Sequence, residues 1–328
     1  MKKRILLIFA IIIPVVLITL FSLKDNSHLF IHELWAYDNW GQNINGRNGK
    51  AGIDMNLQEA WKYTKGSSDI VIALVDTGVN ISLEYLNIYN NGIDSWDFYN
   101  NQEKIYNCEL FDYHGTYLAA AICSNDNDVP GVAPESSILP IKFMEGTSGN
   151  SDDAAASLKY ACDKSVQIVN CSWAMSTNNT ALYDVIKDNP NILFVCAAGN
   201  EGTNLDKYMI YPASYDLDNI IVVTAINNQG KLYDSAGYGS YVTIAAPGQD
   251  IFVKFTDKEN GYVDGTSVAT AYVSGIASLM LSVNSELTPT DIKQIIIETA
   301  TTTPDLKGLC ESNGYINAGE AIKQAIEY

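Results

Sequence analysis

The stretch "IVIALVDTGVN", residues 70–80, places an aspartate, Asp76, at the end of six consecutive apolar residues. A continuous apolar run of this length is typical of a strand buried on both faces of a parallel sheet. Thr77 and Gly78 follow it directly, as in the Asp-Thr-Gly triplet of aspartic proteases. Asp76 is therefore one of three things: a turn residue, half of a catalytic aspartate pair, or a carboxylate that works with another side chain.

Similar apolar runs recur along the chain and alternate with helical segments. The runs are "QIVNCSW", "NILFVCAA" and "IIVVTAI", and the helical segments between them include "SDDAAASLKYACDKS" and "NTALYDVIKD". Strands that alternate with helices imply a parallel sheet. The sequence has no internal repeat and no low-complexity tract, so it predicts one α/β domain.

Three further segments are expected to be helical. "NLQEAWKYTKG" predicts a short helix stopped by Gly66, and "TSVATAYVSGIASLMLSV" predicts a long apolar one. "LTPTDIKQIIIETA" predicts another, with Thr288 as N-cap, Pro289 at the first helical position and Asp291 at the third.

Composition and charge narrow the class of protein. The chain has 328 residues, of which 47% are hydrophobic and 18% charged, as expected for a globular protein with a sizeable core. Its formal net charge of −18 excludes a nucleic-acid partner, because phosphate binding requires clustered Lys and Arg. The acidic surface favours solubility.

The N-terminus predicts export. Lys2, Lys3 and Arg4 precede 19 residues without a charge (5–23), long enough to cross a hydrocarbon core, and no A-x-A cleavage pattern follows. Basic residues before such a segment keep the N-terminus in the cytoplasm and place the rest outside. The alternative is a long cleaved signal peptide, with a secreted product. The expected division is 1–24 anchor or signal peptide, 25–50 linker and N-terminal arm, and 51–328 a single α/β domain.

Six cysteines allow up to three disulfides in an oxidising compartment. No C-x-x-C motif is present, so a zinc ribbon or a redox motif is not expected. Cys171 and Cys196 lie within apolar runs, where buried free thiols are the simpler interpretation.

An aspartic protease needs two carboxylates that share a proton, and the sequence has no second Asp-Thr/Ser-Gly. A homodimer would supply the partner, but those protomers are small β-proteins. His28 and His32 lie just after the apolar N-terminal segment, so His114, in "DYHGTYLAAAI", is the only imidazole of the α/β part. A lone histidine at a helix start is often structural.

Two more residues lie at the ends of predicted elements. Ser267 begins the long apolar helix, where free N–H groups and the positive end of the helix dipole stabilise an oxyanion. Asn200 follows Gly199 at the end of the buried run "NILFVCAAGN", so its amide is expected at the carboxyl edge of the sheet. A turn built by Asn-Glu-Gly is the alternative for Asn200.

The chain order Asp76, His114, Asn200, Ser267 resembles that of the subtilase family of serine proteases. The resemblance extends from "ELWAYDNWGQ" to "GYINAGEAIKQA" and includes the blocks "VDTGV", "HGTYLAA", "AAGNEG" and "GTSVATAYVSG". It implies an α/β, subtilisin-like three-layer fold with a mainly parallel central sheet flanked by helices. It also implies that Asp76 orients His114, that His114 takes the proton of the nucleophile Ser267, and that Asn200 holds the oxyanion.

Some positions depart from the family pattern. Tyr117 replaces the second histidine of His-Gly-Thr-His, and Tyr272 the histidine of the serine block, so the two tyrosines are expected to pack together. The substrate strand reads Ser172-Trp173-Ala174 instead of Ser-Leu-Gly, and Trp173 either faces the core or narrows a subsite. Ile210, just before "YPAS", replaces a glycine of the pocket for the residue before the cut, which predicts a shallower pocket, and Gly199 is also expected to contact the substrate.

The resemblance implies no cofactor for catalysis, and no metal in the active site. "SNDNDVPG" resembles a loop that binds structural calcium in many secreted subtilases, and oxygen ligands suit Ca²⁺. However, Leu83, Glu84 and Tyr85 replace the usual His-Pro-Asp and remove a carboxylate. A solvated polar turn is the alternative.

Degradative subtilases usually carry a folded propeptide. Only about ten residues separate Lys24 from the start of the subtilase-like sequence, and these are expected to be too few for a folded propeptide. This favours members with a narrow task, such as some lanthipeptide leader peptidases, acting on a peptide or protein substrate. The alternatives are a broad degradative protease and a non-catalytic binding protein of the same fold. The sequence does not specify an oligomeric state.

Overall fold

The computed structural model describes residues 33–106 and 113–328. A nine-stranded sheet with the order β14-β15-β11-β10-β9-β8-β3-β5-β4 forms its centre. Neighbouring strands run parallel except β14 and β15. The strands are β3 (Val71–Asp76), β4 (Trp96–Asp97), β5 (Ser137–Lys142), β8 (Ile168–Cys171), β9 (Leu193–Ala197), β10 (Ile220–Ile226), β11 (Ile244–Pro247), β14 (Thr301–Thr302) and β15 (Gly314–Tyr315). The mainly parallel sheet is confirmed.

Helices and short ribbons surround this sheet. The helices are α1 (Leu57–Ala60), α2 (Tyr113–Cys123), α3 (Ser151–Cys162), α4 (Thr180–Lys187), α5 (Thr266–Val283), α6 (Pro289–Glu298) and α7 (Ala318–Glu327), with short 3-10 turns at Tyr89–Gly92 and Pro304–Leu306. Three two-stranded ribbons complete the fold: β1 (Asn43–Ile44) with β2 (Arg47–Asn48), β6 (Met144–Glu145) with β7 (Ser148–Gly149), and β12 (Ile251–Lys254) with β13 (Asn260–Val263).

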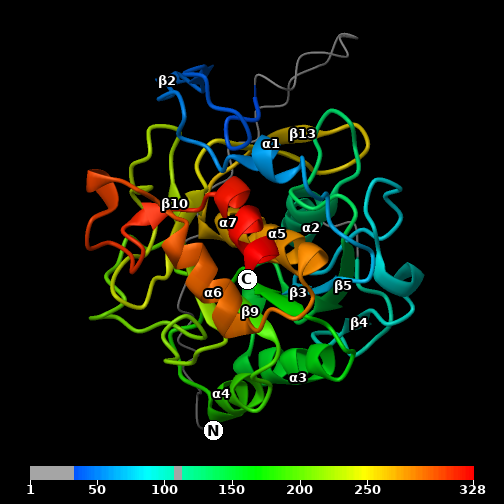
Figure 1. Ribbon diagram of the computed structural model, residues 1–328. Coiled ribbons are helices and arrows are strands. Elements are labelled where there is room, and N and C mark those ends of the chain that lie inside the picture. Colours follow the sequence, from blue (N-terminus) through cyan, green and yellow to red (C-terminus); the bar gives the residue numbers. More distant parts are fainter. Residues whose placement is uncertain (1–32, 107–112) are drawn as a thin grey trace, which may run out of the picture.

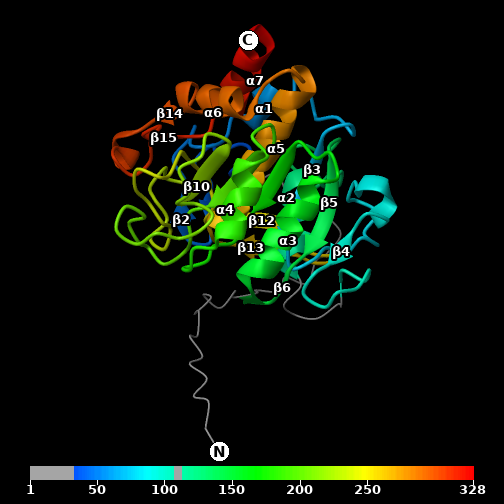
Figure 2. The same ribbon diagram turned by 90° about the horizontal axis from the view of Figure 1, so that it is seen from below.

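Each face of the sheet buries its own hydrophobic core. In Figure 1, α3 and α4 lie below the labels of β3 and β9, whereas α5 and α7 lie above them. Figure 2 shows α1, α6 and α7 grouped on one side of the molecule. Side chains of β3 alternate between the cores: Ile72 and Leu74 belong to the core with α2, α5 and α7, and Val71, Ala73 and Val75 to the core with α3 and α4. This alternation explains why the whole strand is apolar.

The local helix signals are largely confirmed. The long apolar helix spans Thr266–Val283, and Thr288 caps α6 through a capping box with Asp291. The helix expected to continue to Gly66 is wrong in length, because α1 ends at Ala60. There the N–H groups of Lys62 and Tyr63 bond to carbonyls three residues back, which tightens the chain into turns.

The described part of the N-terminal arm lies against the domain. Trp35 is fully buried, and its Nε1 donates to the carbonyls of Gln249 and Asp250, both at 3.1 Å. Arg47 pairs with the Asp250 carboxylate at 2.9 Å. The arm therefore covers the segment that leads into β12. The anchor segment 5–23, the rest of 1–32 with His28 and His32, and Cys108 are outside the described residues.

Among the described residues the five cysteines are free thiols: Cys123, Cys162, Cys171, Cys196 and Cys310. Cys171 and Cys196 are buried neighbours on β8 and β9, which confirms the simpler interpretation for that pair. Within the described part, α5 alone is long and apolar enough to cross a membrane, and 83% of it is buried in the protein. Its apolar character is accounted for by its place in the core.

The strand register brings the expected site residues to one edge. In the parallel pair of β3 and β8, Leu74 lies opposite Asn170, so Asp76 and Ser172, each two residues further along, continue to the same edge. On the next strand, β9 ends at Ala197, three residues before Asn200. Neighbouring strands lie about 4.8 Å apart, so these residues converge.

Candidate active site

Asp76 and His114 form the central contact of the site. His114, on α2, places its Nδ1 2.7 Å from Oδ1 of Asp76, and the same oxygen accepts the N–H of Thr77 at 2.7 Å. Asp76 is fully buried, whereas the His114 side chain is 30% exposed. A carboxylate only accepts hydrogen bonds, so Nδ1 carries the proton and Nε2 is left free as a base. This arrangement can orient an imidazole and stabilise its cation.

Ser267 is the second residue of α5, and its hydroxyl donates to the carbonyl of Ser172 at 3.0 Å. Among the described residues, no hydrogen bond joins the Ser267 hydroxyl to His114. Such bonds are often long or misaligned before substrate binds. Ser172 directly follows β8, the neighbour of the strand that ends at Asp76, so the serine and the histidine approach the same edge of the sheet from α5 and α2.

Thr266, the residue before Ser267, orients the side chain of Asn200. Its Oδ1 accepts the backbone N–H of Thr266 at 2.9 Å and the Thr266 hydroxyl at 3.2 Å. Its Nδ2 makes no hydrogen bond within the described part of the chain. The amide oxygen is therefore fixed at the start of α5, where the backbone N–H of Ser267 is among those that have no acceptor within the helix. These donors can hold an oxyanion.

A series of hydrogen bonds between buried side chains ends at the backbone carbonyl of Ser267. Ser274 Oγ donates to Asn170 Oδ1 at 2.8 Å, and Asn170 Nδ2 donates to Ser172 Oγ at 2.8 Å. Ser172 Oγ in turn donates to the carbonyl of Ser267 at 2.9 Å. All four residues are buried. Asn170, Thr266 and Ser274 were not singled out in the sequence, because nothing in their local pattern distinguishes them from other buried polar residues.

The structure resolves the alternative left open for Trp173. Its side chain faces the core, where the indole Nε1 donates to the carbonyl of Val75 at 2.8 Å and the ring lies 4.8 Å from that of Phe143. Trp173 therefore narrows no subsite with its side chain. Ala174 is half-buried and leads to Met175, which exchanges two backbone hydrogen bonds with Tyr211 at 2.8 and 2.7 Å.

Ile210 fills the space beside Gly199. A Cβ built on Gly199, whose φ is 83°, would lie 2.8 Å from Ile210 Cδ1 and 3.0 Å from Glu201 Oε2. Glu201 Oε2 also accepts the N–H of Asn200 at 3.0 Å. Ile210 and Glu201 thus occupy the space beside Gly199, and Ile210 directly precedes Tyr211, which pairs with Met175. Glu201 was missed in the sequence because it reads there as part of a polar turn.

The expected contact between Tyr117 and Tyr272 is wrong. Tyr117 packs edge-on against His114, with ring centroids 5.2 Å apart, and against Phe255 at 5.6 Å. Tyr272 packs instead on Tyr37 of the arm, at 5.8 Å. The two tyrosines belong to different helices and face different neighbours. Burial, together with the charges of Asp76 and Asp264, raises the pKa of Tyr117, so its ring stays neutral beside His114.

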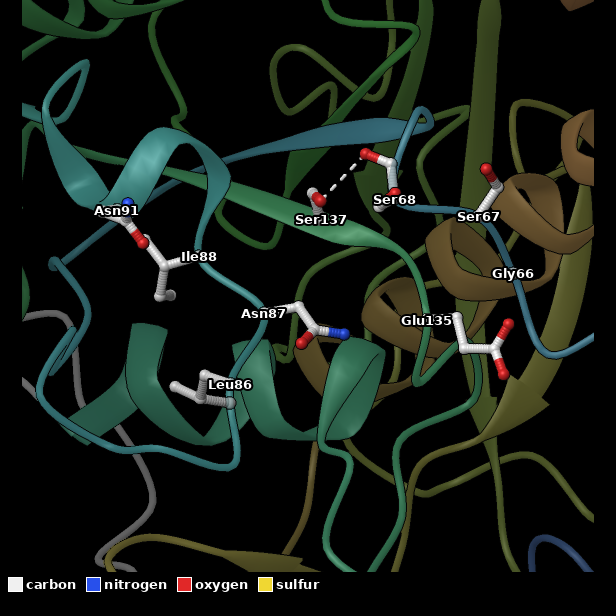
Figure 3. A pocket seen from close by; sticks show the side chains of 9 residues that line it. All are labelled: Gly66, Ser67, Ser68, Leu86, Asn87, Ile88, Asn91, Glu135 and Ser137. Carbon is white, nitrogen blue, oxygen red and sulfur yellow. Dashed lines mark hydrogen bonds between the residues drawn. The ribbon is translucent and has the colours of Figure 1, made fainter.

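A cavity of about 630 Å³ lies at the amino ends of β3 and β5, at the opposite edge of the sheet from Asp76. Figure 3 shows it between the start of β5 and the loop after β3, lined by polar side chains such as Asn87, Glu135 and Ser137. The catalytic candidates are absent from its lining. In residues 33–106 and 113–328, no three His, Cys, Asp or Glu side chains form a group that could hold a metal ion.

Comparison with known proteins identifies the family. The model of the subtilase family (peptidase S8) matches residues 67–315. The thermophilic serine proteinase of Bacillus sp. strain AK1 is 33% identical over 74% of this chain, which spans 59% of that protein. Thermitase of Thermoactinomyces vulgaris is 30% identical over 68% of this chain and 78% of its own length.

A solved structure has the same fold. The prenylagaramide maturation protease PagA superimposes with a TM-score of 0.68 at 24% identity, over 82% of this chain and 98% of its own. The family model covers the strand that ends at Asp76, the helix that carries His114 and the helix that begins beside Ser267. The chain therefore belongs to the subtilase family of subtilisin-like serine proteases.

Proposed function

We propose that this chain is a serine endopeptidase whose catalytic triad is Asp76, His114 and Ser267. The observation that carries the proposal is the 2.7 Å contact between His114 Nδ1 and Asp76 Oδ1, at the edge where Ser172 holds Ser267. It fixes the tautomer in which His114 Nε2 accepts a proton. Rotation about the Ser267 Cα–Cβ bond, from one staggered rotamer to another, would move the hydroxyl from the Ser172 carbonyl towards His114.

The reaction then proceeds through an acyl-enzyme. Ser267 Oγ forms a bond with the scissile carbonyl carbon while its proton passes to His114 Nε2, and the oxyanion accepts from Asn200 Nδ2 and the Ser267 N–H. The C–N bond breaks as His114 gives that proton to the leaving amine. A water molecule, deprotonated by His114, next attacks the ester, and Ser267 leaves with the proton restored.

The substrate would lie extended along Ser172–Ala174 and pair with this segment through main-chain hydrogen bonds. Ile210 beside Gly199 supports a shallow pocket that takes a small side chain before the cut. A shallow pocket favours a processing task, such as trimming the leader of an exported peptide, over general degradation. The structurally similar PagA is, by its name, a maturation protease.

The enzyme would act outside the cell. The basic residues and the uncharged segment 5–23 support an anchor in the cytoplasmic membrane, with the domain on the outer side. At that place it would meet peptides as they leave an exporter.

Mass-spectrometric mapping of cleavage in a peptide library tests this proposal. Wild type is compared with Ser267→Ala and with Ser278→Ala, a matched change on the same helix at a serine that bonds to Ser136. We expect a few related cleavage sites for wild type and Ser278→Ala, each after a small residue, and none for Ser267→Ala. Many unrelated sites would indicate a degradative protease. No cleavage above that of Ser267→Ala would indicate a binding protein.

A further inference from the structure

The loop 124–131, which resembles a calcium loop, holds its central carboxylate with groups of the chain itself. Oδ1 of Asp126 accepts the backbone N–H groups of Asp128 and Val129, at 2.9 and 3.0 Å. Oδ2 of Asp126 accepts from the Nζ of Lys254 at 2.6 Å. Burial alone would raise the pKa of Asp126, but Lys254 and the two N–H groups outweigh burial and lower it. The carboxylate is thus ionised, and both of its oxygens accept hydrogen bonds from the chain.

Other oxygens of the loop are also engaged. The carbonyl of Val129 accepts the Ser124 hydroxyl at 2.9 Å, and the carbonyl of Ser124 accepts the N–H of Gly131 at 2.8 Å. Calcium requires six to eight oxygen ligands at roughly 2.3–2.6 Å. A calcium ion on Asp126 would have to displace an ammonium group already in contact with it. The residues present do not fit a divalent ion at this place.

Lys254 itself is buried in a manner that requires a partner. It is the last residue of β12 and only 8% exposed, and a buried ammonium is costly unless it is paired. Its Nζ also lies 5.0 Å over the ring of Tyr85, the residue that stands where a carboxylate was expected. The ammonium therefore has an anion on one side and an aromatic face on another.

We propose that the ammonium of Lys254 is the built-in structural cation of this loop and takes the place of a metal ion. It joins three segments: the loop after α2, the Tyr85 loop after β3, and β12. His114 lies at the other end of α2, and β12 pairs with β13, which ends four residues before Ser267. The ion pair thus holds α2, which carries His114, against the β12–β13 ribbon, which precedes Ser267.

Hydrogen exchange of loop 124–131 and thermal unfolding test the proposal, with the full chain carrying Ser267→Ala to prevent self-digestion. With Lys254 present, loop exchange and Tm should be the same in calcium and in EGTA. Lys254→Met should lower Tm by roughly 5 °C or more and speed loop exchange. Once Lys254→Met is made, Asp126→Asn should have little further effect, because the pair is already broken.

Lys164→Met is the matched control. Lys164 also pairs with a carboxylate, Asp94, at 2.6 Å and lies 4.9 Å over a ring, that of Tyr160, but its side chain is 29% exposed, against 10% for Lys254. Its loss should leave exchange in loop 124–131 unchanged. Faster loop exchange in EGTA than in calcium, with Lys254 intact, would overturn the proposal. So would normal loop exchange in Lys254→Met.

Discussion

Asp76, Thr77 and Gly78 each make a different contact near the start of α2. The Asp76 carboxylate holds His114, and the Thr77 hydroxyl accepts the N–H of Gly115 at 3.0 Å. Gly78 has a φ of 103°, and a Cβ there would lie 1.8 Å from the carbonyl oxygen of Ile105. A Cβ on Gly115 would likewise lie 2.2 Å from the carbonyl oxygen of Gly78. The triplet thus lets helix and strand approach closely enough for the carboxylate to reach the imidazole.

The triad members should act as a unit. We expect Ser267→Ala and His114→Ala each to remove nearly all peptidase activity, and the double variant to be little worse, since each step needs both groups. Steady-state kinetics on one peptide check this, with thermal unfolding to show that the variants fold. Substantial turnover by Ser267→Ala would exclude this serine as the nucleophile.

Asn200 should matter to turnover more than to binding. Asn200→Ala is expected to lower kcat by ~10²–10³ with KM nearly unchanged, because its amide meets charge that develops only in the transition state. The separation of kcat and KM is the measurement. If KM rose while kcat stayed the same, Asn200 would be a substrate contact or a structural turn.

Ile210 should set the size of the residue accepted before the cut. Ile210→Ala opens the space beside Gly199, so kcat/KM for a peptide with Phe at that position should rise by ~10-fold or more relative to the same peptide with Ala. Two peptides that differ only there provide the comparison. An unchanged ratio would show that Ile210 does not line the pocket.

At the scale of elements, α5 and β8 share the hydrogen-bonded chain Ser274–Asn170–Ser172–Ser267. Ser274→Ala leaves Asn170 Oδ1 without its donor, which should loosen the support of the nucleophile and lower kcat by up to ~10-fold with KM little changed. The rate at which a sulfonyl fluoride modifies Ser267 reports the nucleophilicity of this serine without a peptide substrate.

Ser157→Ala is the control for that change. Ser157 is a fully buried serine of α3 whose hydroxyl has no partner among the described residues, so its loss should leave both rates intact. If Ser274→Ala lowered Tm but Ser267 still reacted with the sulfonyl fluoride at the wild-type rate, the chain of hydrogen bonds would only stabilise the core.

At the scale of the whole molecule, we expect residues 5–23 to stay attached and to hold the domain at the outer face of the cytoplasmic membrane. The polar stretch 24–33 would reach at most roughly 30–35 Å when extended, which keeps the site near the bilayer. Cell fractionation and sequencing of the mature N-terminus check this. A soluble product that begins after residue 23 would identify the segment as a signal peptide.

The sequence by itself determined what depends on neighbours a few residues away. The buried strand that ends at Asp76, the long helix that begins beside Ser267 and the capping box of Thr288 and Asp291 all follow from local patterns. The same patterns predicted a mainly parallel sheet, because alternating strands and helices leave few other solutions. They also predicted which residues reach its carboxyl edge.

Only the tertiary structure decided which distant groups meet. Lys254 and Asp126 are 128 residues apart, and Ser274 and Asn170 are 104 apart. Such contacts depend on how β12 and α5 pack against the other elements, about which no local pattern is informative. Trp173 shows the same limit: the sequence allowed both the core and the cleft, and the register of β8 beside β3 turned its indole to the carbonyl of Val75.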